Sequence, residues 1–417
     1  MKSAICGVDF GTSNSAVALP SGEVLRIDAR AADARLFRSV LFFPDEEPAF
    51  RAGAEAIEEY LLRSEGRFIQ SVKGWLSSRS FTATQVAGRT YKLEDLVGML
   101  LRRIRERAEA AAGVRLDAAV LGRPALFADE PADDALAERR LLRAAELAGF
   151  PSVRLVIEPI AAALAYEAAL GRDELVLVAD FGAGTSDLTI MRLGPERRTR
   201  ADRRGDVVAT DGVPVGGDRF DAEIMRHKRL RYFGGGSTYE QMGKRMPMPS
   251  SILGKLLSWH EMSFIREKRT IDLIDRMLYA SDDVPAIEAL EDLVQENLGY
   301  RLYRAIEAAK VQLSSVRNAR IQYDEARVHI DEPVSRGEFE QFVAPLVGAL
   351  AGCVDRLLAK AQLAPSQIDA VFLTGGTSQI PIVRELFRAR FGEERLRSAD
   401  AFTSVAEGLG RSAGALG

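Results

Sequence analysis

The sequence is poor in the residues that build disulfide frameworks and zinc sites. Its 417 residues include only two cysteines, Cys6 and Cys353, and three histidines that lie far apart in the chain. This count rules out a disulfide framework, and the histidines leave no zinc-ligand spacing.

Long apolar runs and an excess of one charge are also missing. The longest uninterrupted apolar run, Ile160 to Tyr166, is far too short to span a membrane. The chain reaches Asp9 before it could hold the apolar centre of a secretory signal. With 56 Lys+Arg against 60 Asp+Glu the net charge is −4, which does not indicate nucleic-acid binding. We therefore expect a cytoplasmic protein with neither a membrane nor a nucleic-acid partner.

The composition that remains, 47% hydrophobic and 28% charged, is typical of a globular protein with a sizeable core. The length favours two or more domains or one large bilobal unit. Strands are predicted at 4–9, 16–19, 118–121, 175–180, 188–191 and 370–373. Apolar spacing predicts helices at 93–104, 135–148, 160–169, 302–313 and 339–363. Alternating strands and helices indicate an α/β class.

One motif occurs twice, at Gly7–Ser15 (GVDFGTSNS) and at Val178–Asp187 (VADFGAGTSD). Each copy places an Asp at the end of an apolar strand, followed by Phe-Gly, small and hydroxyl residues, and a second strand. Either copy alone would more simply be an ordinary β-turn. The pair predicts two related lobes, each presenting one hairpin to a shared cleft.

The residues of these hairpins favour phosphate together with a divalent cation. Glycines allow the backbone to approach a phosphate closely, and successive N–H groups form an anion-binding nest. Thr12, Ser13 and Thr185 add hydroxyl donors. Asp9 and Asp180 would repel a bare phosphate, so a cation with its waters is expected between carboxylate and phosphate.

Three further motifs accompany the hairpins: Glu158–Tyr166, Gly216–Asp218 and Gly375–Ser378. In this order the set resembles the nucleotide-binding domain of DnaK-type seventy-kilodalton heat-shock chaperones, part of the actin-like ATPase superfamily. The resemblance covers essentially the whole chain. It implies a bilobal actin-like ATPase (ribonuclease H-like) α/β fold with duplicated lobes around a nucleotide cleft. Lobe I would comprise 1–171 with 394–417, and lobe II 172–393.

Within that family, three short segments look like the YegD-type branch of short bacterial relatives. They are Ser71–Gly74, Gly122–Pro124 and Met246–Pro249. The resemblance implies a chain without a peptide-binding domain, whose unknown client or partner would be a separate protein.

Two further segments stand out by their composition. Residues 226–299 form an expanded insertion whose aromatic side chains, such as Tyr232, Trp259 and Phe264, make it a candidate partner contact. A solvated helix with its apolar side packed is the simpler interpretation. The arginine-rich segment 197–204 is predicted to be a solvated hairpin loop.

The resemblance also implies residue roles, with ATP or ADP and Mg²⁺ as cofactors. Asp9 and Asp180 would hold the magnesium through water. Lys73 would contact the γ-phosphate, Glu158 would polarise the attacking water, and Asp187 would support this network, so that Lys73, Glu158, Asp180 and Asp187 form the catalytic set. The other cofactor-binding residues would be Gly11, Thr12, Ser13, Asn14, Gly182, Ala183, Gly184, Thr185, Gly216, Gly217, Asp218, Glu307, Lys310, Ser314, Gly375, Gly376, Thr377 and Ser378.

Three positions depart from the family pattern. Ala183 replaces the middle glycine of the second hairpin, where a methyl group is tolerable if φ is negative. Val311 and Gln379 stand where the family has the arginines that sandwich the adenine. Because a cation–π contact contributes ~0.5–2 kcal/mol, losing both would weaken adenine binding about tenfold or more.

We therefore expect an ATP-binding, slowly ATP-hydrolysing chaperone-like switch. Three alternatives stay open at this point: a small-molecule (sugar-type) kinase, an actin-like filament-forming protein, and a nucleotide sensor that hydrolyses nothing. All of them share the fold and the cleft.

Overall fold

The computed structural model describes residues 3–414 except 46, 48, 64–65, 87, 199, 201–202, 258–264, 266, 399 and 401. Trp259 and Phe264 of the predicted insertion therefore lie outside the described residues. The chain divides into two compact units, the first formed by Met1–Gly216 with Ala349–Gly417 and the second by Gly217–Gly348. The predicted lobe boundaries at 171 and 394 follow the duplicated motif rather than this packing, and they stay a prediction.

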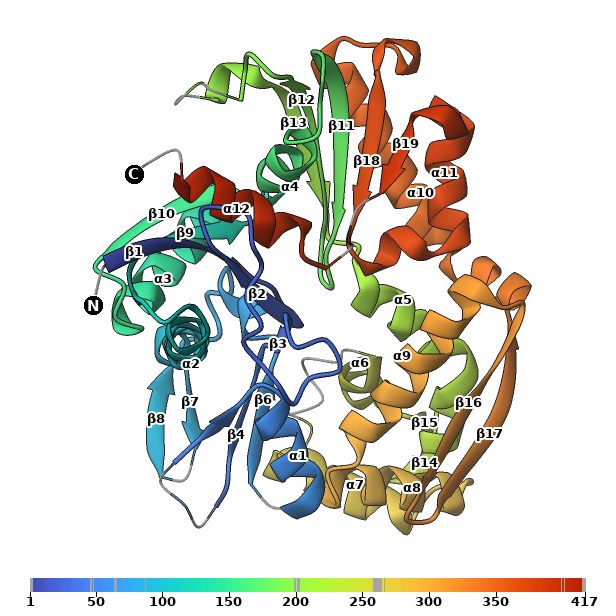
Figure 1. Ribbon diagram of the computed structural model, residues 1–417. Coiled ribbons are helices and arrows are strands. Elements are labelled where there is room, and N and C mark those ends of the chain that lie inside the picture. Colours follow the sequence, from blue (N-terminus) through green and yellow to red (C-terminus); the bar gives the residue numbers. More distant parts are fainter. Residues whose placement is uncertain are drawn as a thin grey trace. The chain divides into compact units, whose positions relative to one another are not determined.

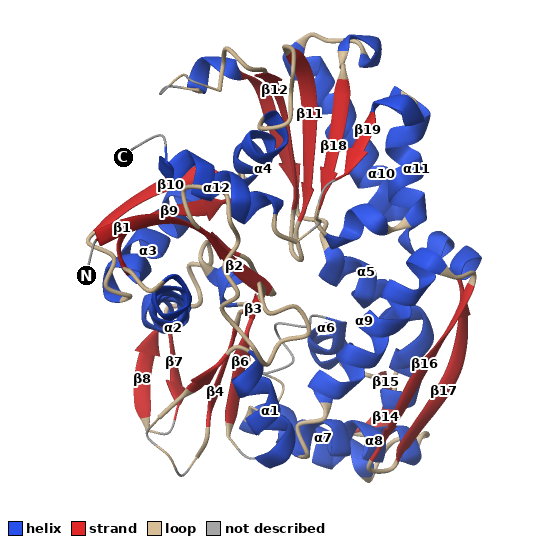
Figure 2. Cartoon of the chain, viewed as in Figure 1, coloured by secondary structure: helices blue, strands red, loops and turns tan. Residues whose placement is uncertain are grey.

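Two five-stranded sheets form the centre of the first unit (Figures 1 and 2). Their strands are β1 (Ser3–Phe10), β2 (Asn14–Ala18), β3 (Phe37–Arg38), β9 (Arg115–Arg123) and β10 (Ser152–Ile157), and β11 (Glu174–Phe181), β12 (Ser186–Leu193), β13 (Val207–Val213), β18 (Ala370–Thr374) and β19 (Leu396–Ser398). The strand orders are β10-β9-β1-β2-β3 and β19-β18-β11-β12-β13.

The two sheets also share their strand directions. In each, the central strand pairs antiparallel with the next strand along the chain and parallel with a later one: β1 with β2 and β9, and β11 with β12 and β18. The predicted α/β fold with a duplicated sheet is confirmed. The strands predicted from apolar runs all form within these two sheets.

The predicted helices form as well, with bounds that differ by a few residues. They are α2 (Leu93–Ala112), α3 (Pro131–Leu147), α4 (Glu158–Glu167), α9 (Gly299–Ser315) and α10 (Arg336–Ala361). The first unit also holds α1 (Ala54–Arg63), α11 (Pro381–Phe391), α12 (Ser404–Gly414), the small sheet of β4 (Val40–Phe43), β5 (Arg51–Ala52) and β6 (Arg67–Gln70), and the hairpin of β7 (Ala83–Val86) and β8 (Arg89–Lys92).

Helix α12 links the two sheets of the first unit through α4 (Figure 1). It packs against β1 and β2 of the first sheet and against α4, which in turn packs against β11 and β12 of the second sheet. The contact with α4 is made by backbone. A Cβ atom at Gly408 would lie 1.7 Å from the carbonyl oxygen of Ala161. Only glycine fits at this helix crossing.

The second unit consists of helices and two hairpins. Besides α9 and the first part of α10 it holds α5 (Gly217–Ile224), α6 (Ser250–Leu257), α7 (Lys268–Leu278) and α8 (Val284–Gln295), and the hairpins of β14 (Thr238–Gln241) with β15 (Lys244–Pro247) and of β16 (Asn318–Glu325) with β17 (Val328–Ser335). Strand β16 alternates strictly, with Ala319, Ile321 and Tyr323 buried between exposed neighbours.

The basic start of the predicted insertion is paired within this unit. Arg229 and Arg231 contact Glu332 at 2.8 and 3.0 Å, and the Tyr232 ring lies beneath both guanidinium groups. These side chains are engaged by the protein itself. A partner contact by the insertion stays a prediction.

Helix α10 is the one helix in the described part of the chain whose length and apolar composition would suffice to cross a bilayer. Core helices of soluble proteins meet the same criterion, and Phe339, Val343, Val354 and Leu357 of α10 are buried.

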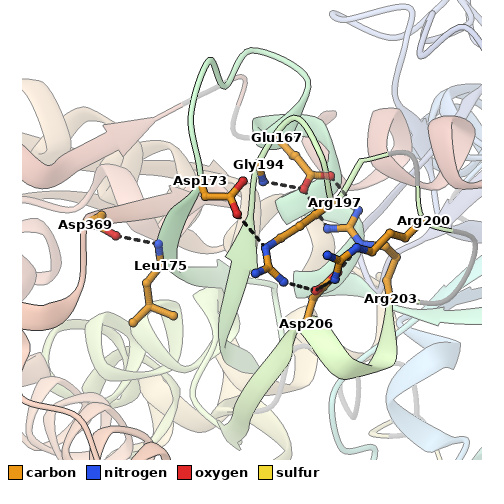
Figure 3. Close-up of polar contacts among 9 residues, drawn as sticks. All are labelled: Glu167, Asp173, Leu175, Gly194, Arg197, Arg200, Arg203, Asp206 and Asp369. Carbon is orange, nitrogen blue, oxygen red and sulfur yellow. Dashed lines mark hydrogen bonds and ion pairs between the residues drawn. The ribbon is translucent and has the colours of Figure 1, made fainter.

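The sequence predicted a solvated loop for the arginine-rich segment after β12. In the structure, arginines of this segment instead pair with buried carboxylates (Figure 3). Arg203 donates two hydrogen bonds to Glu167, at 2.7 and 2.8 Å, and a third to Asp206 at 2.7 Å. Both carboxylates are almost fully buried. Arg197 adds a second contact to Asp206 at 2.5 Å. The arginines therefore neutralise buried carboxylates at the end of the second sheet.

Arg203→Ala should lower the free energy of unfolding by about 2 kcal/mol at pH 7, because it leaves two buried carboxylates short of their partner. Burial alone would raise the pKa of Asp206, but Arg203 and Arg197 outweigh it and hold that pKa below its ordinary value. The ionised Asp206 therefore contributes fully to the free energy of unfolding at any pH above the ordinary pKa of an Asp side chain. This contribution is lost as the pH falls from there through the lower pKa of the folded protein. Urea unfolding at pH 7 measures the effect.

Arg200→Ala is the matched control, because Arg200 lies in the same segment, is half exposed and approaches Asp206 at 3.4 Å. Its cost should stay below about 0.5 kcal/mol. Equal effects of the two substitutions would contradict a special role for Arg203.

Candidate functional site

The two repeated motifs form matching hairpin turns in the first unit. Register pairs Phe10 with Ser15 across β1 and β2, and Phe181 with Ser186 across β11 and β12. The second turn is closed by the Gly182 N–H, which donates to the Thr185 carbonyl at 2.9 Å. Ala183 has no positive φ, so the condition under which its methyl group is tolerated is met.

Lys73 and Glu158 form a buried ion pair. Both residues come after the first turn and before the second in the sequence. The Lys73 ammonium lies 2.5 Å from Glu158 Oε1, and each residue is only 8% exposed. Lys73 stands on the 3₁₀ turn Val72–Trp75, which follows Ser71 in a left-handed conformation with φ of 54°. A buried non-glycine residue in that region is strained by about 1 kcal/mol, as is frequent at functional sites. Glu158 is the first residue of α4, directly after β10.

Asp187 is held from two sides. Its Oδ1 accepts the Ala125 backbone N–H and its Oδ2 accepts the Thr185 hydroxyl, both at 2.9 Å. Sequence reasoning missed Ala125. The available signal was its place just beyond the carboxyl end of β9, the strand that pairs parallel with β1.

The electrostatics of the first unit bring together Asp9, Asp180, Asp187, Glu158 and Lys73. Burial raises the pKa of Asp9 and of Asp187 to about 7, and the Glu158 charge adds to both shifts. Burial, Glu158 and Asp9 raise the pKa of Asp180 well above its ordinary value. Burial alone would lower the pKa of Lys73, but Glu158 and Asp9 outweigh it and raise it. Lys73 thus contacts Glu158 and interacts electrostatically with Asp9, Asp180 and Asp187.

This excess of negative charge fits a divalent cation. Within the described residues, no group of three or more His, Cys, Asp or Glu side chains is placed to hold a metal ion directly. Magnesium usually keeps several of its waters and takes one or two carboxylates together with substrate phosphates. The donor set therefore suits hydrated magnesium better than a metal enclosed by protein ligands.

A cavity of ≈ 70 Å³ opens beside this cluster. Thr185 and Asp187 line it together with residues 126–129 and 212–214. It has room for a few waters but not for a nucleotide.

The remaining residues predicted for the first unit lie around the two turns. Asn14 accepts a hydrogen bond from Arg38 at 3.1 Å. Gly216 lies against the backbone of Ala183. A Cβ atom added at Gly216 would lie 2.3 Å from the Ala183 carbonyl oxygen. The structure gives no side-chain partner for Thr12 or Ser13 within the described residues. The Ser13 carbonyl accepts the backbone N–H of Ser39 at 3.0 Å, which fixes the first turn.

The turn Gly375–Ser378 packs directly on the second hairpin. Gly375 has φ of 83°, and a Cβ there would lie 2.1 Å from the Phe181 carbonyl oxygen. The Ser378 hydroxyl donates to the Gly375 carbonyl at 2.6 Å, and Thr377 is buried. Gln379, where the resemblance predicts an arginine in the family, donates to the Ser378 hydroxyl at 3.2 Å.

Gly217, Asp218, Glu307, Lys310 and Ser314 belong to the second unit. Lys310 lies on α9 and pairs with Asp221 at 2.6 Å, while its ammonium also donates to the Gly217 carbonyl at 3.1 Å. Glu307 pairs with Arg304 instead of Lys310, and Ser314 is partly buried.

Asp221 is a second residue that the sequence analysis missed. Burial raises its pKa to about 6, although Lys310 opposes this shift. Its place on α5, four residues after Gly217, was the available signal, because that spacing puts both on one helix face. Val311, in place of the other arginine, is 61% exposed.

Comparison with known proteins gives a family match. Residues 70–234 and 286–416, well over half of the chain, match the family model described as "Hsp70 protein". The unmatched residues between these ranges fall within the predicted insertion. Two curated relatives are the chaperone proteins DnaK of two strains of Thermus thermophilus, which are 28% and 27% identical to this chain. Each alignment covers 98% of this chain and 60% of the relative, so the chain spans about three fifths of their length.

Proposed function

Because this chain belongs to the Hsp70 family, we propose that it binds Mg-ATP and hydrolyses it slowly, as a chaperone-type switch. One observation carries the proposal: the buried Lys73–Glu158 pair shares its surroundings with Asp9, Asp180 and Asp187, next to two glycine-rich turns. These are the parts that phosphoryl transfer to water requires, namely a cation, an acceptor for the water's hydrogen and carboxylates for magnesium.

Each residue has a defined part in the proposed reaction. Backbone N–H groups of the turns at 11–14 and 182–185 would donate to the β- and γ-phosphates. Asp9 and Asp180 would hold magnesium through its waters, and magnesium would neutralise charge on the phosphates. Lys73 would leave Glu158 to contact the γ-phosphate and the attacking water. Glu158 would orient that water.

Asp187 would act as the hydrogen acceptor of this network. Ala125 and Thr185 each donate to one of its oxygens, so the carboxylate is fixed in orientation. Such positioning matters because the attacking water must lie in line with the bond that breaks. This role deepens the one implied by the sequence.

The wider setting is also part of the proposal. The curated relatives are named chaperones, so we propose that this chain works on protein clients in the cytoplasm. We assign it to the YegD-type branch on the segments 71–74, 122–124 and 246–249.

Calorimetry with Mg-ATP and single-turnover assays of ADP formation test the function. We expect saturable binding, and at 100 times the dissociation constant about 2.7 kcal/mol of added stability in thermal unfolding. ADP should form without any phosphate acceptor. ATP with excess EDTA is the control and should bind more weakly. No binding at millimolar Mg-ATP would overturn the proposal, and binding without turnover would favour the nucleotide sensor.

A further inference from the structure

An exposed aromatic side chain borders the turn Gly375–Ser378, which packs against the second hairpin. Phe402 is 51% exposed. The edge of its ring faces Gly376, since a Cβ at Gly376 would lie 3.4 Å from both Cε1 and Cζ of that ring. Because about half of this side chain is exposed, a second planar group has room to stack on the ring.

The segment that carries Phe402 is fixed at several points. The Phe402 backbone N–H donates to Asp400 Oδ1 at 3.2 Å, and the other Asp400 oxygen pairs with Arg35 at 2.7 Å. Ser404, the first residue of α12, shares a hydrogen bond with Thr374 at the end of β18, at 2.5 Å. The exposed ring is therefore held against the turn by contacts on both sides of it.

The position of the turn relates Phe402 to the phosphate site. Gly375 contacts the Phe181 carbonyl, and Phe181 directly precedes the second phosphate turn. Gly376 is the next residue, and Phe402 borders it. A nucleotide whose phosphates lie at residues 182–185 can extend its base along this surface.

We propose that Phe402 is the stacking partner of the nucleotide base, an inference that rests on the proposed function. Every purine and pyrimidine has a π-face, and an aromatic side chain stacks on it without needing charge. Gln379, the residue after Ser378 of this turn, offers an amide and no guanidinium to the base. The contribution of the base to the binding free energy should therefore come from stacking on the Phe402 ring and not from a cation–π contact.

Two ligands separate base stacking from phosphate binding. Affinities of Mg-ATP and of magnesium tripolyphosphate, which has neither base nor sugar, are measured by calorimetry on the full chain. Phe402→Ala should weaken Mg-ATP binding about tenfold and leave tripolyphosphate binding unchanged. The matched control is Leu62→Ala, which removes an exposed apolar side chain on α1 of the same unit and should change neither affinity.

Phe402→Trp gives a second readout that does not depend on a loss. It should keep Mg-ATP affinity within about twofold, and bound ATP should quench its added fluorescence relative to the wild-type signal. Equal loss of both ligands in Phe402→Ala, unchanged Mg-ATP affinity, or no quenching of the tryptophan would overturn the stacking role. A wild-type chain that binds neither ligand would overturn the proposed function itself and the inference with it.

Discussion

Replacing Lys73 by alanine should slow the hydrolysis of bound ATP about 10²–10³-fold, while the affinity for Mg-ATP changes only a few-fold. Lys73 is buried and lies within hydrogen-bond distance of Glu158. A buried cation that moves onto the transferred phosphoryl group stabilises the charge that develops there, and removing one such donor typically has this cost. Single-turnover ADP formation at saturating Mg-ATP measures it.

Lys92→Ala is the control for this substitution, because Lys92 is an exposed lysine of the same unit. It should hydrolyse ATP at the wild-type rate. Thermal unfolding of both variants shows whether each is folded. A Lys73→Ala variant that is folded and hydrolyses within threefold of wild type would remove Lys73 from the catalytic set.

The second large effect concerns stability. Gly408→Val should lower the free energy of unfolding by about 3 kcal/mol or more, because its Cβ would overlap the Ala161 carbonyl at 1.7 Å. Overpacking usually costs about 1–3 kcal/mol, and here the obstacle is backbone, which cannot move aside as a side chain can. Urea unfolding followed by circular dichroism gives the difference.

Gly352→Ala in α10 provides a contrast of opposite sign. A Cβ at Gly352 would have its nearest contact at 3.7 Å, an ordinary distance to the end of the Arg356 side chain. Alanine is the better helix former, so this variant should gain up to about 1 kcal/mol. A loss of similar size in both variants would show that the α12–α4 contact is not the cause.

The sequence was informative about the strands and helices with long, regular apolar patterns. The central strands β1 and β11 read as near-continuous apolar runs because both of their faces are covered. The hairpin β16–β17 was missed, since its buried Ala319, Ile321 and Tyr323 alternate with polar residues that dilute the signal. The smaller strands β3 and β5 are two residues long, too short for any periodicity.

For the site, the sequence supplied the residues and the structure supplied their partners. The repeated motif pointed to Asp9 and Asp180, and the resemblance added Asp187, Lys73 and Glu158. That Lys73 pairs with Glu158 across 85 positions could not be read from spacing. Backbone donors such as Ala125 carry no side-chain signature at all. The roles of these residues in binding and hydrolysis stay predictions.

Helix α12 also has a consequence for the order of events during synthesis. A Cβ at Gly7 in β1 would lie 2.1 Å from the backbone nitrogen of Gly410 in α12, so the first strand is completed by residues made about 400 positions later. At ribosomal rates that interval lasts roughly 20–80 s. Throughout it the first sheet lacks the helix that packs on β1 and β2, and apolar surface exposed in this way makes a nascent chain prone to aggregation.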